Sequence, residues 1–101
     1  MPVELEFSTD AIRVSLVGAL DFSTQDQLDA IIERVITDDS SREVRVDMAR
    51  TSFIDSSALR ALLRLRQGAL ADGKAMTIWN CNEKIREIFA VSGFDQVFVM
   101  R

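Results

Sequence analysis

Histidine is absent from this chain of 101 residues, and cysteine occurs once, as Cys81. The absence of histidine removes the commonest general base and the commonest transition-metal ligand of proteins. A single cysteine excludes an intrachain disulfide and a zinc site built on cysteine ligands. We therefore expect no metal site in this chain.

Positive charge is also scarce: 12 Lys and Arg stand against 16 Asp and Glu, a formal net charge of −4. Nucleic-acid binding normally needs a basic patch, and anionic membrane surfaces attract basic segments. No apolar run approaches the roughly 20 residues of a membrane-spanning helix. The acidic, alternating start at residues 1–7 is unlike a signal peptide. We expect a soluble cytoplasmic protein without nucleic-acid or membrane partners.

The chain is long enough for one compact domain and too short for two. Hydrophobic residues make up 48% of it and charged residues 28%, which is typical of a chain that folds. Proline occurs once, at position 2, and no linker or repeat interrupts the sequence. We expect a single domain spanning residues 1–101.

Hydrophobic periodicity predicts the order β-β-α-β-α-β-α-β. Apolar residues alternate with polar ones in the segments 3–7, 12–16 and 44–48, and the mainly apolar segments 76–79 and 97–100 are predicted as two further strands. Three helices begin near Ser23, Ser56 and Asn82, and Ser23 and Asp26 have the spacing of a reciprocal helix cap. Strands that alternate with helices predict an α/β fold with a mixed sheet of four or five strands. Its helices should lie mainly on one face, with Ile32 and Leu62 in the core.

The segment FIDSSAL, residues 53–59, lies where a strand meets a helix. Asp55 or Ser56 at that position could cap the helix, or the serine hydroxyl could be presented for chemistry. Asp21 lies in the loop after the second predicted strand, and Asp55 follows the third. If those strands are parallel neighbours, both carboxylates lie at the same end of the sheet, beside Ser56.

A serine nucleophile needs an adjacent base, and this chain offers no histidine for that role. Lys74 and Lys84 are its only lysines, and neither belongs to a motif that would pair it with Ser56. The G-x-S-x-G signature and the P-loop are also absent. We expect no catalytic residue and no enzyme activity. Ser56 is a candidate for modification by another protein rather than a nucleophile.

The sequence contains VDMARTSFIDSSALRALLRLRQ, preceded by LVGALDFST and followed by MTIWNCNEKIREIFAVSGFDQVF. Through these segments, nearly the whole chain resembles the STAS domain, in particular the bacterial anti-sigma factor antagonists. The most specific part of this resemblance is the D-S-[ST]-G junction, and the G-x-L-D turn and the S-G-[LF] near the end support it. The joint order and spacing of these motifs carry the assignment, because each is weak alone.

The resemblance implies that the anti-sigma factor, a serine kinase, phosphorylates Ser56 and that a phosphatase reverses the step. Unphosphorylated protein would bind that kinase and release a sigma factor, a partner switch typical of stress responses. Any nucleotide would belong to the kinase, so we expect no cofactor here. The expected partner-binding residues are Asp21, Asp55, Ser56, Ser57, Ala58 and Leu59.

Two alternatives remain open. One is a STAS scaffold subunit that is never phosphorylated, as in a lipid-transport ATPase or a stress-signalling assembly; the other is a small-ligand or nucleotide-binding domain. The intact Asp55-Ser56-Ser57 junction favours the switch, whereas Ala58, where the family commonly has Gly, favours the scaffold. The arginines at 60, 64 and 66 are either a partner-facing stripe or a solvated helix face.

Overall fold

The computed structural model describes residues 3–38 and 42–101 of the chain. Its strands are β1 (Val3–Phe7), β2 (Ile12–Leu16), β3 (Gly18–Leu20), β4 (Glu43–Asp47), β5 (Thr51–Ile54), β6 (Ala75–Trp79) and β7 (Val99–Met100). The helices are α1 (Gln25–Ile36), α2 (Ser56–Ala71) and α3 (Glu83–Ser92), with short 3₁₀ helices η1 (Phe22–Thr24) and η2 (Phe94–Gln96).

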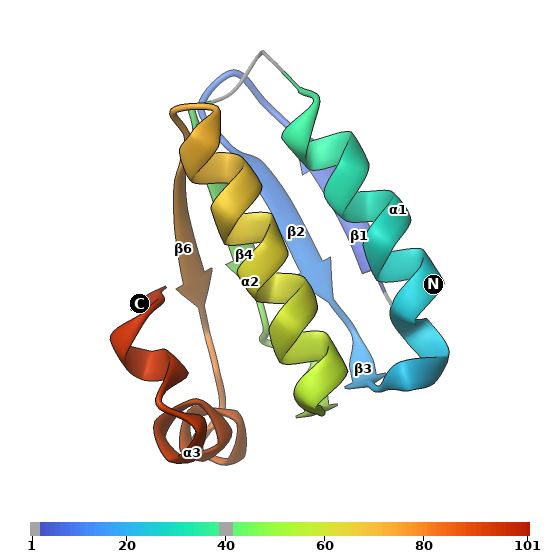
Figure 1. Ribbon diagram of the computed structural model, residues 1–101, viewed down its shortest axis with the longest axis vertical. Coiled ribbons are helices and arrows are strands. Elements are labelled where there is room, and N and C mark those ends of the chain that lie inside the picture. Colours follow the sequence, from blue (N-terminus) through green and yellow to red (C-terminus); the bar gives the residue numbers. More distant parts are fainter. Residues whose placement is uncertain (1–2, 39–41) are drawn as a thin grey trace.

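Five strands form a mixed sheet in the order β1-β2-β4-β6-β7. The hairpin of β1 and β2 is antiparallel, and the remaining pairs are parallel. Helices α1 and α2 lie side by side across one face of this sheet, and α3 lies at its lower end in Figure 1. These features confirm the predicted α/β class and the mixed sheet of five strands.

The core lies between the sheet and the helix pair, and it follows the alternation seen in the sequence. Val14 and Val46 are 2% and 0% exposed, and they face the helices from adjacent strands. Ile32 of α1 and Leu62 of α2 are 7% and 4% exposed, which confirms both as core residues. No helix in the described part of the chain is long and apolar enough to cross a membrane.

Three strands differ from the prediction. Strands β3 and β5 were not expected, and they pair in parallel as a separate two-stranded sheet. They have only three and four residues, too few to establish a period. The last strand is also shorter than the predicted 97–100, because the Phe98 N–H bonds back to the Phe94 carbonyl oxygen as the chain leaves η2.

The predicted cap of the first helix is wrong. Ser23 lies inside η1, and the carboxylate of Asp21 caps that turn by accepting from the Ser23 N–H at 2.9 Å. Helix α1 therefore begins two residues later, at Gln25, and its N-cap Thr24 makes no side-chain cap bond. Because Asp21, two residues upstream, caps the preceding turn, Ser23 lies within that turn and cannot be the N-cap of α1.

Candidate functional site

The junction between β5 and α2 is built around Asp55. This residue has extended backbone angles and is the N-cap of α2, which begins at Ser56 as predicted. Its Oδ1 atom accepts from the Ala58 N–H at 2.9 Å and from the Ser57 hydroxyl at 2.6 Å. One carboxylate thus holds the whole first turn of the helix.

The β3–β5 pair brings the second acidic loop to the same place. Leu20 lies opposite Ile54 in the register, and the Asp55 N–H donates to the Leu20 carbonyl oxygen at 3.1 Å. The chain turns into η1 directly after Leu20, and the backbone N–H of Phe22 is among the groups that lower the pKa of the Asp55 carboxyl. The sequence predicted that Asp21 and Asp55 would share one end of the sheet. They do so through β3 and β5, not through the longer β2 and β4.

The two serines of the junction lie in different environments. Ser56 is exposed, and its hydroxyl has no hydrogen-bond partner among residues 3–38 and 42–101. Ser57 is only 9% exposed, and its hydroxyl is bonded to Asp55. A modifying enzyme can therefore reach the first hydroxyl, while the second belongs to the packing of the helix.

The predicted partner-binding residues divide in the same way. Asp21, Asp55 and Ser56 lie at the surface. The side chains of Ala58 and Leu59 are 1% and 6% exposed, so they pack in the core. The Ala58 methyl group points towards α1, where it lines a small apolar cavity, and it does not narrow the approach to Ser56 from outside.

The Asp55 carboxyl group is poorly suited to general acid–base catalysis. The Ser57 hydroxyl and the Ala58 N–H, both donating to Asp55, hold the pKa of this carboxyl below its usual range. A carboxylate with a lowered pKa is a weak base at neutral pH. Within the described residues, no cluster of three or more Cys, Asp and Glu side chains could hold a metal ion.

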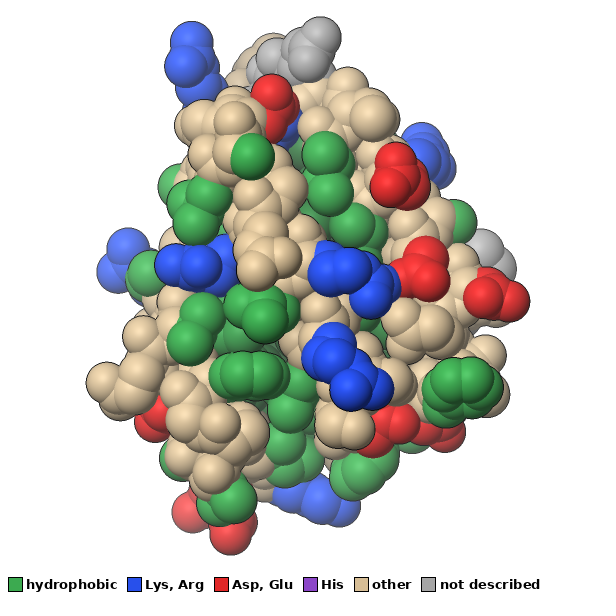
Figure 2. Space-filling model, viewed as in Figure 1, with side chains coloured by type: hydrophobic (Ala, Val, Ile, Leu, Met, Phe, Trp, Pro, Cys, Tyr) green, Lys and Arg blue, Asp and Glu red, His purple; other side chains and the backbone are tan. Residues whose placement is uncertain are grey.

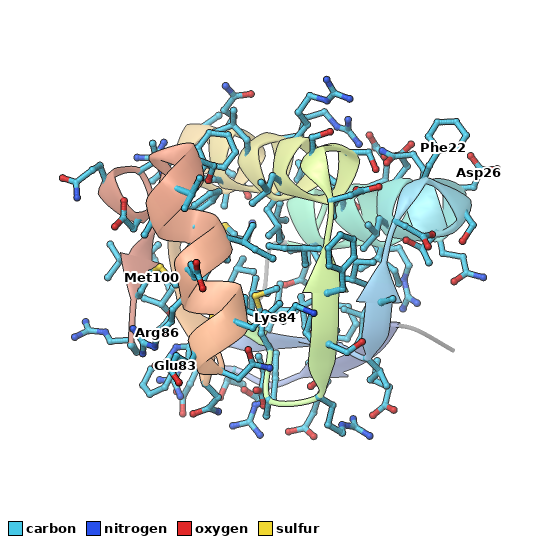
Figure 3. All side chains as sticks on the ribbon, turned by 90° about the horizontal axis from the view of Figure 1, so that it is seen from below. Phe22, Asp26, Glu83, Lys84, Arg86 and Met100 are labelled. Atoms are coloured by element: carbon cyan, nitrogen blue, oxygen red, sulfur yellow. The ribbon has the colours of Figure 1, made fainter. Side chains whose placement is uncertain are left out.

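Sequence reasoning missed two surface features beside the junction. Phe22 is 79% exposed on η1, and Figure 3 shows it projecting outwards near Asp26. A groove of about 450 Å³ lies between β5 and α3, bordered by Phe53, Ile88 and Lys84, whose ammonium group lies 5.9 Å from the Phe53 ring. An apolar residue directly after the acidic turn was the only available signal for Phe22.

The sequence of this chain is similar to that of a known protein family. The family model described as "Mlab, STAS domain" matches residues 3–101. A STAS-domain containing protein of Pseudomonas aeruginosa (strain UCBPP-PA14) is 32% identical over 87 residues, which cover 86% of this chain and 84% of that protein.

Solved structures share the fold at lower identity. The anti-sigma factor antagonist SpoIIAA in its unphosphorylated form has a TM-score of 0.82 at 23% identity, covering 98% of this chain and 87% of that one. An anti-sigma factor antagonist from Mycobacterium paratuberculosis has a TM-score of 0.85 at 21% identity, over 97% and 82%. A sulfate transporter family protein from Wolinella succinogenes reaches 0.76 at 15% identity, over 89% and 75%.

Proposed function

The chain belongs to the STAS domain family, and on that premise we propose that it is an anti-sigma factor antagonist controlled by phosphorylation of Ser56. Unphosphorylated, it binds an anti-sigma factor that is a serine kinase, and a sigma factor is released. Phosphorylated, it lets the kinase go, and a phosphatase restores the binding form. The proposal places these events in the cytoplasm, where sigma factors act.

The observation that carries this proposal is the contrast between the two serines. Ser56 offers an exposed hydroxyl without a partner in the described chain, whereas the Ser57 hydroxyl is buried and bonded to Asp55. Solved antagonists of this fold include SpoIIAA in its phosphorylated form. A modification at Ser56 changes the surface and leaves the first-turn bonds of α2 intact.

Charge explains why such a modification would switch binding. A phosphate adds about −1.5 to −2 charges at neutral pH. At the first residue of α2, the helix dipole tolerates that charge, so the fold survives. A partner that docks on Ser56, Asp21 and Asp55 would meet a bulky anion and two carboxylates together, and binding would weaken through repulsion and desolvation.

The direct test combines phosphorylation with binding. The protein is incubated with the candidate kinase and ATP, and mass spectrometry locates the phosphate. We expect it on Ser56, abolished by Ser56→Ala and retained in the matched control Ser57→Ala. Titration of the kinase should give parent-like affinity for Ser56→Ala and weaker binding for Ser56→Glu, with similar melting temperatures. Phosphate on Ser57, or equal affinity for Ser56→Glu, would contradict the mechanism.

A scaffold subunit of a transporter ATPase is the second candidate. The shared fold with a sulfate transporter family protein favours it, whereas the buried Ala58 methyl group does not decide between the two candidates. A scaffold would copurify stoichiometrically with an ATPase subunit, and Ser56→Glu would leave that complex intact. Ser56→Glu should therefore weaken the complex of an antagonist with its kinase but leave the complex of a scaffold with its ATPase subunit intact.

A further inference from the structure

Arg60 lies one helical turn after Ser56 and is not used by the fold. Its side chain is exposed, and within the described residues it makes no ion pair and no hydrogen bond. Arg64, one turn further along α2, is held by the Asp29 carboxylate of α1. In Figure 2, basic side chains lie over α2, and acidic ones border them on the α1 side.

The helix geometry directs Arg60 towards Ser56. Residues four apart on a helix are neighbours on one face, with Cβ atoms about 5–6 Å apart. Helical side chains also lean towards the N-terminus, so a long side chain covers the turn that precedes its own Cα atom. The guanidinium group of Arg60 can therefore reach the space outside the Ser56 hydroxyl. An anion that precedes a cation by four residues is the favourable orientation of such a pair.

The two carboxylates of the junction already accept hydrogen bonds from other groups. Asp55 accepts from Ser57 and Ala58, and Asp21 accepts from the Ser23 N–H and hydroxyl. In the unmodified protein, the neutral Ser56 hydroxyl gives Arg60 no charge to pair with. A phosphate at that position would supply oxygens suited to the planar fork of a guanidinium group.

We propose that Arg60 is the positioning residue for the phosphate on Ser56, which it holds against the surface of α2 by a charge-assisted pair within the same helix. This inference rests on the proposed function and adds its molecular consequence. The phosphate becomes a fixed part of the docking surface, and the phosphorylated form gains helix stability that the unmodified form lacks.

The charges around Ser56 determine in which direction the loss of Arg60 would shift the second pKa of the phosphate. Asp21 and Asp55 lie at the same junction as Ser56, and their carboxylates oppose the second ionisation of a phosphate there. Among the other cations nearby, Arg64 is paired with Asp29, and Lys84 lies over the Phe53 ring. If Arg60 is removed, no nearby unpaired cation among the described residues offsets the effect of the two carboxylates, and the second pKa of the phosphate should rise.

The experiment needs no kinase. The full chain is prepared with phosphoserine installed at position 56 by chemical ligation, and the phosphate is titrated by ³¹P NMR. Relative to the parent, Arg60→Gln should raise the second pKa of the phosphate by about half a unit, and Arg60→Lys should lie between the two. The matched control is Arg66→Gln, which lies about 15 Å along the helix from Ser56 and should leave that pKa unchanged.

Thermal melts supply the second readout. Phosphorylation should raise the melting temperature of the parent more than that of Arg60→Gln, while the two unmodified proteins should melt alike because Arg60 has no partner among the described residues. Identical phosphate pKa values in the parent and Arg60→Gln would overturn the inference. That failure is separate from a failure of the proposed function, which would appear as a kinase that leaves Ser56 unmodified.

Discussion

Replacing Asp55 should reveal how much the functional junction contributes to stability. Asp55→Ala removes the acceptor for two groups: the Ala58 N–H and the Ser57 hydroxyl. Asp55→Asn keeps an acceptor oxygen of the same shape but removes the charge. The pair of variants therefore separates the loss of the cap from the loss of the carboxylate.

The magnitude follows from the groups left unpaired. Loss of an N-cap acceptor costs about 1 kcal/mol. Ser57 is 9% exposed, and a buried hydroxyl without a partner costs about another 1 kcal/mol. We expect Asp55→Ala to lower the free energy of unfolding by about 2 kcal/mol, or roughly 10 °C in melting temperature for a domain of this size. Asp55→Asn should cost about half as much, because bonds to charged acceptors are roughly twice as strong.

Urea denaturation followed by circular dichroism measures these values. Asp95→Ala is the matched control, because Asp95 is exposed and no interaction of its side chain is seen in the described structure. It should change the free energy of unfolding by less than about 0.5 kcal/mol. An Asp55→Ala protein as stable as this control would refute the role of Asp55 as the organiser of the junction.

The same carboxylate gives a pH dependence of known sign. The Ser57 hydroxyl and the Ala58 N–H lower the folded-state pKa of Asp55. Its stabilising contribution is therefore present above the ordinary carboxyl pKa and is lost as pH falls through the folded-state pKa. Between about pH 5 and pH 3, the parent should lose more stability than Asp55→Asn. Parallel stability curves for the two proteins would contradict this assignment.

Two further predictions concern the helix layer. Leu62→Ala and Ile32→Ala should each lower the free energy of unfolding by about 2–5 kcal/mol, whereas Leu70→Ala, at a position 49% exposed, should cost under about 0.5 kcal/mol in the same urea titration. Gly68→Ala should destabilise by about 1 kcal/mol net, because the added methyl group overlaps Ile36 and overpacking outweighs the gain in helix propensity. Adding Ile36→Ala should make the Gly68→Ala change stabilising, and a cycle without coupling would refute this contact.

The elements predictable from sequence were those with local signals. Alternation identified β1, β2 and β4, a mainly apolar segment identified β6, and caps identified the starts of α2 and α3. Strands β3 and β5 could not be identified in this way, because three or four residues establish no period and their stability comes from pairing with each other. The convergence of Asp21 and Asp55 was correctly predicted, although from a different pair of parallel strands.

The environments of the two serines were partly encoded in the helical period. Ser57 precedes Ala61 by four residues and so lies on the buried face of α2, while Ser56 precedes Arg60 and lies on the exposed face. By contrast, the exposure of Phe22 depends on how β3 and β5 present η1. That arrangement is tertiary and has no counterpart in local pattern.

The different roles of the residues in the junction support the proposed switch at Ser56. The groups on which the fold depends are the Asp55 carboxylate, the Ser57 hydroxyl and the Ala58 methyl group, and all three are bonded or buried. Ser56 shares the same turn but contributes nothing to those contacts. In the proposed switch, a charge placed on Ser56 would therefore change the docking surface at almost no cost to folding, since the helix dipole offsets part of the added charge. The same separation would let a scaffold protein keep this fold while its first serine remained unmodified, so the chemistry at Ser56 distinguishes the two functions and the fold does not.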